Sequence, residues 1–461
     1  MIAMRTPESQ PDDHQQEEPS FQHSSTEEKN LEQQKAPEKH PEPSLIKPPQ
    51  ESAHPDREAQ PGKPAQNQTT EPVVGKSHHT SPATEVKEKT EAKTGLKPDP
   101  EIKTAALPQA EPAAEHDIIK EYMMLMSVKQ KIGQRFITKI EGTELHHRNL
   151  RLISRQYAGG VILYPWNIES AEQINTLTRN IQQAAMQNFP PVKLFIGVDR
   201  EGGRVSSFRF NQLCRFPAPY YWAQYNDPKY IAKASYVINR ELVALGCNMN
   251  FAPVLDLYGR PDGTIIGDRS MGNDPEKIAG FGLSYLRGAR EAGVIPVIKH
   301  FPGHGGSTVD SHSALPAVDM GLGELEQRDL KPFIQAIQHG APAVMTGHIL
   351  FPRIDPLYPA TISEHILGDL LRNKYGFQGV IITDGLSMGA LSNHFSTEET
   401  LDRLFHVGVD LILVHHRYSL EDLTDQVYEL YLEGKISMEE IDQGVERILR
   451  LKQEYGLIPG N

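Results

Sequence analysis

The chain has 461 residues and a formal net charge of −13, with 47 Lys+Arg against 60 Asp+Glu. Proteins that wrap nucleic acid need a basic face to replace phosphate counterions, so this balance argues against a nucleic-acid partner. There are only two cysteines, Cys214 and Cys247, and no CxxC pair, which excludes a disulfide framework and a cysteine-based zinc or redox site.

The first 116 residues differ in composition from the rest of the chain. They hold 17 of the 35 prolines and a single aromatic residue, Phe21, with 13 basic residues against 21 acidic ones, a net charge of −8. Such a segment cannot bury enough apolar surface to offset its chain entropy. We predict a disordered Pro/Glu/Lys-rich tail over 1–116, acting as a linker or docking segment, and a folded domain over 117–461.

From about residue 117 onward, short apolar runs alternate with amphipathic helical patterns. The latter include SAEQINTLTRNIQQAAMQ (170–187), DPKYIAKASYVINRELVALG (227–246) and EKIAGFGLSYLRGAREAG (276–293), and a capped C-terminal helix within 436–457 closes the domain. The runs are continuously apolar or β-branched, as expected of strands covered on both faces. The predicted strands are 132–138, 160–165, 194–198, 248–254, 294–299, 343–349, 379–383 and 410–414.

Eight strands that alternate with helices over about 345 residues predict an α/β fold, a (β/α)₈ TIM-like barrel. An open doubly wound sheet is the alternative, but no GxGxxG follows an early strand to support a dinucleotide site. No run reaches the roughly 18 apolar residues that span a bilayer, and the N-terminus lacks the features of a signal peptide. We therefore expect a protein without a transmembrane segment, cytoplasmic unless a leader is missing upstream. We also expect a monomer.

Polar residues follow several of the predicted strands, where a barrel places its chemistry. LFIGV leads into Asp199-Arg200-Glu201, VIPVI into Lys299-His300, AVMTG into His348, and GVIIT into Asp384. Four such clusters at matching positions indicate one site at the carboxyl ends of the strands. Any one of them alone has an ordinary explanation, such as a helix cap at Asp384 or a turn at Asp199.

The segment KHFPGHGGSTVDSH (299–312) is the richest in titratable groups. His300, His304, His312 and Asp310 could hold a metal, but the glycines and Pro302 remove the helical spacing on which common zinc motifs depend. Alternatively Asp310 orients His312 as a general acid/base on a loop that the glycines allow to swing. A histidine that only caps an ordered loop is the third interpretation.

Together these segments resemble glycoside hydrolase family 3, specifically its single-domain β-N-acetylglucosaminidases. The resemblance covers roughly residues 120–455 and rests on motifs that occur in the family's order: DREGGRV, NFAPVLDL, GTIIGDRSMGNDP, VIKHFPGHGGSTVDSHSALP, MTGHILFPRID, YPATIS and GFQGVIITDGLSMGAL. It implies a retaining exo-β-N-acetylglucosaminidase that acts on glycans or muropeptides in cell-wall recycling, without metal or organic cofactor.

The resemblance also implies roles for single residues. Asp384 would be the nucleophile, and His312 with Asp310 the acid/base dyad. Four further positions would hold the N-acetylglucosamine ring, and His304 would shape the loop. The four are Asp199, Arg269, Lys299 and His300.

Two positions depart from the family pattern. Arg200 stands where the family has Gln, and Ser207 where it has a second substrate-binding arginine. Arg200 and Arg209 are the two candidates to compensate for that loss. Sugar preference is therefore less fixed than reaction type. The alternatives are a related β-glycosidase, a phosphorylase of the same family, and a non-catalytic barrel that binds wall fragments.

Overall fold

The computed structural model describes residues 117–459 apart from 209, 263, 308–314 and 416, and the predicted tail over 1–116 lies outside them. Eight parallel strands form one sheet in the order β10-β1-β2-β3-β6-β7-β8-β9. A parallel bridge between Ile382 and Leu411 joins its two edges, so the sheet curves into a nearly closed barrel. The strands are β1 (Phe136–Lys139), β2 (Gly160–Ile162), β3 (Phe195–Val198), β6 (Met249–Asn250), β7 (Ile295–Phe301), β8 (Ala343–Thr346), β9 (Val380–Thr383) and β10 (Ile412–Val414).

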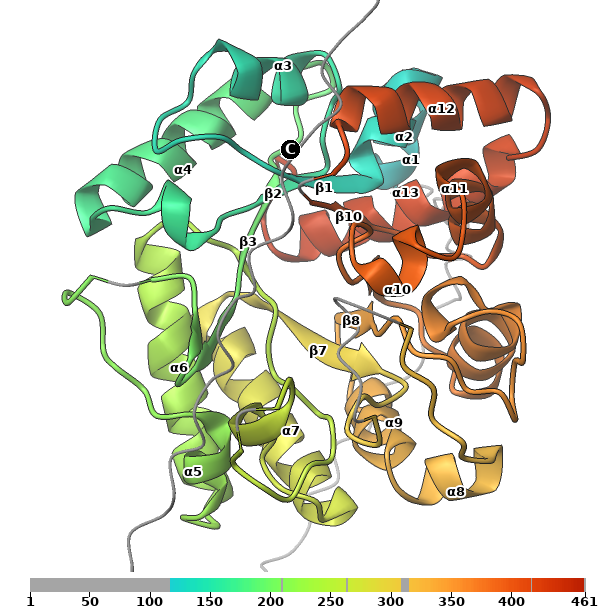
Figure 1. The fold of residues 1–461 in the computed structure, drawn as a ribbon. Helices are drawn as coiled ribbons and strands as arrows, with labels where there is room; N and C mark the ends of the chain where they lie inside the picture. The colour runs from blue at the N-terminus through green and yellow to red at the C-terminus, as the bar shows by residue number, and fades with distance from the viewer. Residues whose placement is uncertain (1–116, 209, 263, 308–314, 416, 460–461) are drawn as a thin grey trace, which may run out of the picture. The chain divides into compact units, whose positions relative to one another are not determined.

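A helix follows each strand and lies on the outside of the barrel (Figure 1). In chain order these helices are α3 (His147–Ser154), α4 (Ala171–Ala185), α6 (Pro228–Ala244), α7 (Pro275–Ala292), α9 (Leu330–Gln338), the π-helix η4 (His365–Lys374), α11 (Thr397–His406) and α12 (Leu420–Leu432). Additional helices are α1 (Ile118–Leu125), α2 (Val128–Gln134), α5 (Pro219–Ala223), α8 (Leu322–Gln327), α10 (Gly389–Ser392) and α13 (Met438–Glu454). None of the described helices is long and apolar enough to cross a membrane.

Alternation along each strand separates an interior core from an outer one. In β9, Val380 and Ile382 pack with Phe195, Met249 and other residues inside the barrel. Ile381, between them, packs instead with the surrounding helices. Successive strand side chains point to opposite faces, and here both faces are apolar because helices cover the outer one.

Helix α13 covers the amino-terminal ends of the strands. It begins at a capping box in which Ser437 and Glu440 satisfy each other's backbone N–H groups. Its residues Ile448 and Leu451 pack into the interior core. The predicted closing helix is therefore confirmed, and it seals the barrel end opposite to the one that bears the polar strand ends.

The predicted barrel and the existence of all eight strands are confirmed. Three strands end earlier than predicted (160–165 at Ile162, 248–254 at Asn250, 343–349 at Thr346), and the first strand begins later. Residues 132–134 belong to α2, and β1 begins only at Phe136. The capping box of α2, formed by Ser127 and Gln130, starts a helix that continues through the apolar Ile132. A short apolar run does not distinguish a buried helix end from a strand, which is why the sequence placed the boundary too early.

Candidate active site

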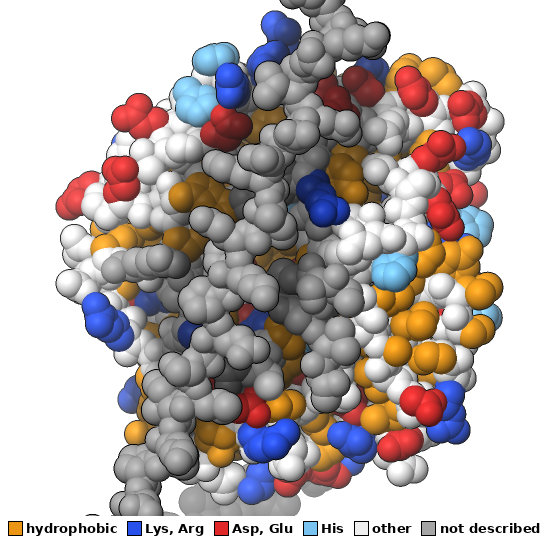
Figure 2. Space-filling model, in the orientation of Figure 1, with side chains coloured by type: hydrophobic (Ala, Val, Ile, Leu, Met, Phe, Trp, Pro, Cys, Tyr) orange, Lys and Arg blue, Asp and Glu red, His pale blue; other side chains and the backbone are white. Residues whose placement is uncertain are grey.

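A cavity of about 440 Å³ opens at the carboxyl ends of the strands. It collects side chains from β7, from the residues directly after β3 and β9, and from the loop that precedes α7. Five residues predicted for the site line it together with His304; they are Asp199, Arg269, Lys299, His300 and Asp384. On the face shown in Figure 2, Lys and Arg side chains are interspersed with Asp and Glu. The part of this face that the structure describes therefore shows no single basic patch that would attract a nucleic acid.

Lys299 is the centre of a buried charge network. Its Nζ lies 2.8 Å from Asp199 Oδ1 and 2.7 Å from Glu201 Oε1. Glu201 comes from β4 (Arg200–Gly202), which pairs with β5 (Val205–Ser206) in a hairpin directly after β3. Burial lowers the pKa of Lys299, but the two carboxylates outweigh it and the pKa is raised overall. Lys299 is therefore held as a cation beside the cavity.

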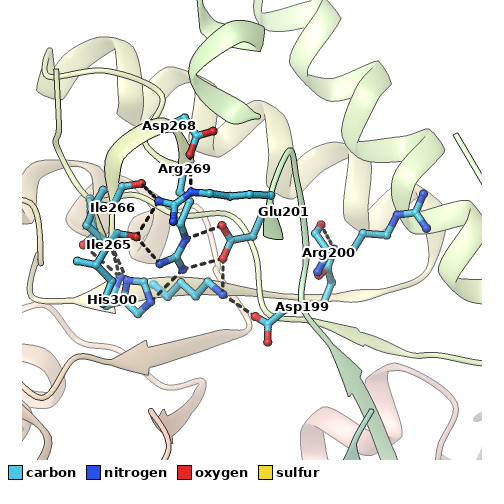
Figure 3. Close-up of polar contacts among 12 residues, drawn as sticks. Asp199, Arg200, Glu201, Ile265, Ile266, Asp268, Arg269 and His300 are labelled. Atoms are coloured by element: carbon cyan, nitrogen blue, oxygen red, sulfur yellow. Dashed lines mark hydrogen bonds and ion pairs between the residues drawn. The ribbon is translucent and has the colours of Figure 1, made fainter. Parts of the chain in front are cut away.

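Arg269 completes the network from the other side. Its Nε and Nη2 both donate to Glu201 at 2.8 Å, a bidentate pair (Figure 3). Burial raises the pKa of Glu201, but Arg269 and Lys299 outweigh it and bring that pKa to about 2. Because Asp199 is one third exposed while Glu201 is buried, Glu201 serves as the internal anchor and Asp199 faces the cavity.

The loop that carries Arg269 is fastened to the same hairpin. Arg204 Nε donates to Asp268 Oδ1 at 2.7 Å, and its Nη2 donates to the carbonyls of Ile265 and Ile266 (Figure 3). Arg269 occupies the last position of η2 (Gly267–Arg269), a short 3₁₀ turn. The DREGGRV motif thus positions both the carboxylates and the arginine that faces them.

His300 is oriented by Asp256, which follows β6. The imidazole Nδ1 lies 2.6 Å from Asp256 Oδ2, and its Nε2 lies 3.5 Å from Arg269 Nη2. The Asp256 carboxylate accepts a hydrogen bond from Nδ1–H and so fixes the orientation of the ring. The backbone N–H of His304 also donates to Asp256, at 2.6 Å, which anchors the start of the histidine-rich loop.

Close packing explains two glycines in this loop. A Cβ at Gly305 would lie 1.7 Å from the carbonyl oxygen of Leu257, and one at Gly303 would lie 2.6 Å from Cβ of Asp329. Gly303 also has a φ of +133°, which favours glycine. At these positions glycine is needed for close approach of the chain. The predicted dyad of His312 and Asp310 lies outside the described residues.

Asp384 follows β9 and lines the cavity. Its Oδ1 accepts a hydrogen bond from Gly385 N–H at 2.7 Å. Burial raises its pKa, but the imidazoles of His300 and His348 outweigh this and lower the pKa below its usual value. The buried His348 donates from Nε2 to the Gly385 carbonyl, 3.1 Å away, and so holds the backbone beside Asp384.

Within the described part of the chain, no group of three or more His, Cys, Asp or Glu side chains is arranged to hold a metal ion. His300 and His304 lie near each other, with ring centroids 5.9 Å apart. Their contacts to Asp256 place them in a hydrogen-bonded network with that carboxylate. The third histidine of the metal alternative, His312, lies outside the described residues.

Of the two residues suggested to compensate for Ser207, Arg200 is not among the residues that line the cavity. The Arg200 side chain points away from the side chains of Glu201 and Arg269 (Figure 3). It pairs with Glu241 and donates to the carbonyl of Cys214 at 3.2 Å. Ser207 is buried, and its N–H donates to the Asp199 carbonyl at 2.8 Å. Arg209 lies outside the described residues.

Sequence reasoning assigned no role to Glu201, Asp256, His348 or Tyr164. Glu201 and Asp256 were within motifs already noted. Glu201 lies in β4, shortly after β3, and Asp256 lies in the loop that follows β6. Their pairing could not be anticipated because their partners, Arg269, Lys299 and His300, come from other strands. Tyr164 lines the cavity from the end of β2, a strand to which no polar cluster had been assigned.

Comparison with known proteins agrees with this geometry. The sequence profile of the glycosyl hydrolase family 3 N-terminal domain matches residues 127–451. The chain belongs to glycoside hydrolase family 3. It is 35% identical over 325 residues to "Beta-hexosaminidase A" of Pseudoalteromonas piscicida, and this match covers 65% of the chain and 54% of that protein. It is 37% identical over 281 residues to "Beta-hexosaminidase" of Alkalilimnicola ehrlichii, and this match covers 60% of the chain and 78% of that protein.

Solved structures show the same family 3 domain. A glycoside hydrolase family 3 β-N-acetylglucosaminidase from Paenibacillus sp. aligns with a TM-score of 0.70 at 38% identity, covering 73% of this chain and 64% of that one. The β-N-acetylglucosaminidase of Thermotoga maritima aligns with a TM-score of 0.62 at 29% identity. The family 3 chain thus spans about half of the Pseudoalteromonas relative and less than two thirds of the Paenibacillus structure.

Proposed function

We propose that this family 3 chain is a retaining exo-β-N-acetylglucosaminidase that releases terminal β-linked N-acetylglucosamine. The observation that carries the proposal is the position of Asp384, in the same cavity as the network of Asp199, Lys299 and Arg269. A carboxylate with a lowered pKa stays ionised at neutral pH, as a nucleophile must. The relatives named β-hexosaminidase and β-N-acetylglucosaminidase support the same sugar.

In the proposed mechanism Asp384 attacks the anomeric carbon and forms a glycosyl ester, while the bond to the leaving oxygen breaks. His312, oriented by Asp310, gives its proton to that oxygen. It then takes a proton from water, which attacks the anomeric carbon and frees Asp384. Two displacements at one carbon retain its configuration.

The cationic and anionic groups around the cavity would hold the sugar ring. Asp199 can accept hydrogen bonds from ring hydroxyls, while Lys299 and Arg269 can donate to ring and acyl oxygens. Their mutual ion pairs fix them before substrate arrives, so little ordering is needed on binding. We propose N-acetylglucosamine-containing glycans, in particular muropeptides of cell-wall turnover, as the natural substrates.

The test compares cleavage of an aryl β-N-acetylglucosaminide with that of the matching aryl β-glucoside, with and without inorganic phosphate. We expect the N-acetylglucosaminide to be favoured at least about 100-fold in kcat/KM, with release of the β-anomer of the free sugar by NMR. A preferred glucoside would contradict the sugar assignment. A sugar 1-phosphate product would indicate a phosphorylase, and an inactive protein that still binds the sugar would indicate a binding barrel.

A further inference from the structure

The segment Tyr164–Asn167 places an exposed tryptophan next to the cavity. Tyr164 follows β2 and lines the cavity wall. Trp166, two residues later in η1 (Pro165–Asn167), stacks on the Tyr164 ring with centroids 4.4 Å apart and planes 18° from parallel. The Trp166 side chain is 47% exposed. The aromatic wall of the cavity therefore continues to the protein surface.

The turn that carries Tyr164 and Trp166 is held in place by the side chain of a buried asparagine, Asn167. Asn167 is fully buried, and its Oδ1 accepts from Tyr164 N–H at 3.0 Å. Its Nδ2 donates to the carbonyls of Ile140 and Gly142, at 3.1 and 2.8 Å. The turn is thus fixed to the loop after β1, so Trp166 lies on an anchored turn beside the cavity-lining Tyr164 rather than in a loose loop.

Tyr164 is also supported from its other neighbour in the barrel. The ring of His415, just after β10, meets it edge-on with centroids 5.0 Å apart. His415 lines the same cavity, as do Ser387 and Met388 from the segment after β9. The end of the cavity near Trp166 therefore offers a flat apolar ring, and the adjacent wall offers groups that can hydrogen-bond.

We propose that Trp166 is the platform for the second pyranose of the substrate, the aglycone sugar to which the terminal N-acetylglucosamine is linked. The apolar C–H face of a pyranose matches the face of an indole, whose ring gives a large contact area for little loss of conformational freedom. The inference rests on the proposed function, since it places the first sugar beside Asp384. It adds that the enzyme favours sugar aglycones over small ones.

The first test compares Trp166→Ala with the unaltered protein on N,N′-diacetylchitobiose and on methyl β-N-acetylglucosaminide, which have similar alkoxide leaving groups. We expect kcat/KM for chitobiose to fall about 5–20-fold, at least fivefold more than for the methyl glycoside, and Trp166→Phe to recover most of the loss. Tyr236→Ala on α6 is the matched control, because Tyr236 is exposed to a similar degree, 40%. Tyr236→Ala should leave kcat/KM unchanged for both substrates.

A third substrate, N-acetylglucosaminyl-N-acetylmuramic acid, distinguishes the two sources of a sugar aglycone. If wall fragments are the natural substrate, Trp166→Ala should lower its kcat/KM at least as much as that of chitobiose. If chitin fragments are the natural substrate, the fall in kcat/KM caused by Trp166→Ala should be confined to chitobiose. An equal loss on all three substrates, methyl glycoside included, would overturn the platform and leave Trp166 as a support for Tyr164.

A binding measurement separates this inference from the proposed function. The chain has two tryptophans, and the other one, Trp222, is 1% exposed. In an Asp384→Ala protein, chitobiose should shift the indole emission and reduce its quenching by acrylamide, whereas methyl N-acetylglucosaminide should change it much less. The same protein with Trp166→Phe should show no change. A chitobiose signal that survives this replacement would overturn the platform, and no cleavage of any N-acetylglucosaminide by the unaltered protein would overturn the proposed function.

Discussion

The two ends of the barrel each bury a cluster of charged side chains, but the clusters differ in what they face. At the amino-terminal end, the fully buried Asp410 accepts from Arg372 Nη2 at 2.6 Å and from Arg447 Nε at 2.7 Å. Arg135 donates to the backbone carbonyl of Asp410 at 2.7 Å. At the carboxyl-terminal end, Lys299, Glu201 and Arg269 are just as well paired, but Asp199 and Asp384 beside them line a cavity.

Two buried lysines show the same contrast. Lys299 lies against two carboxylates, which raise its pKa against the effect of burial. Lys452 of α13 is equally buried at the closed end, where its Nζ donates to Gln134 Oε1 at 2.7 Å and lies 4.9 Å from the centre of the Phe195 ring. Burial there lowers its pKa to about 7.

Burial and pairing of charge occur at both ends, so neither identifies an active site. What distinguishes the carboxyl-terminal end is that ionised groups are fixed by pairing and also presented to a cavity. We therefore expect substitutions at the open end to reduce activity with little loss of stability, and substitutions at the closed end to do the reverse.

The largest effect should come from Asp384→Ala. If this carboxylate is the nucleophile, its removal should lower kcat by about 10³-fold or more. The temperature of thermal unfolding should change little, because the hydrogen bond that the structure describes for the Asp384 side chain comes from the N–H of its own neighbour, Gly385. Steady-state kinetics and calorimetry on the same preparation check both parts. Activity close to that of the unaltered protein would remove Asp384 from the mechanism.

At the closed end, Asp410→Asn should be the most damaging change to stability. It leaves Arg372 and Arg447 without their buried counter-charge, for which a loss of about 3–5 kcal/mol in the free energy of unfolding is expected. Asp425→Asn is the matched control: Asp425 pairs with Lys129 at 3.4 Å with more than half of both side chains exposed, so less than about 1 kcal/mol is expected. Denaturant titration measures the free energy of unfolding of both variants. An Asp410→Asn protein that keeps its stability but loses activity would contradict the view that the closed end serves stability and the open end serves activity.

The last prediction concerns the pH dependence of stability. The unfolded Lys452 titrates near pH 10.4, whereas in the folded protein it titrates near 7, so the unfolded state binds more protons between these values. Lys452 therefore makes stability rise as the pH is raised from about 7 to 10. In Lys452→Met, the free energy of unfolding should lack this rise with pH. The unfolding free energies of the two proteins should therefore differ most below pH 7. Equal slopes for both would show that Lys452 is not neutral in the folded protein near pH 8–9.

Much of this structure could be predicted from sequence because its signals are local. Apolar runs such as GVIIT and their spacing predicted all eight strands, and the polar residues after them predicted which barrel end carries the site. The motif order also predicted the family, and five of the predicted site residues line one cavity.

What could not be predicted depends on contacts between distant parts of the chain. Glu201 is the anchor of the network only because Arg269 and Lys299 reach it from other strands. Arg200 was expected near the sugar, but the strand it starts turns its side chain toward Glu241 on α6. Alternation along a two-stranded hairpin decides which of two adjacent residues faces the site, and the motif alone does not show it.

The central claim is that Asp384 forms the covalent bond to the sugar. The most direct measurement incubates the full chain with a 5-fluoro N-acetylglucosaminyl fluoride, used because the acetamido group already occupies C2, and maps the labelled peptide by mass spectrometry. A slowly hydrolysed ester on the peptide containing GVIITDGLSMGAL, located at Asp384 by fragmentation, is the predicted result. A label on Asp199 or any other carboxylate would contradict it.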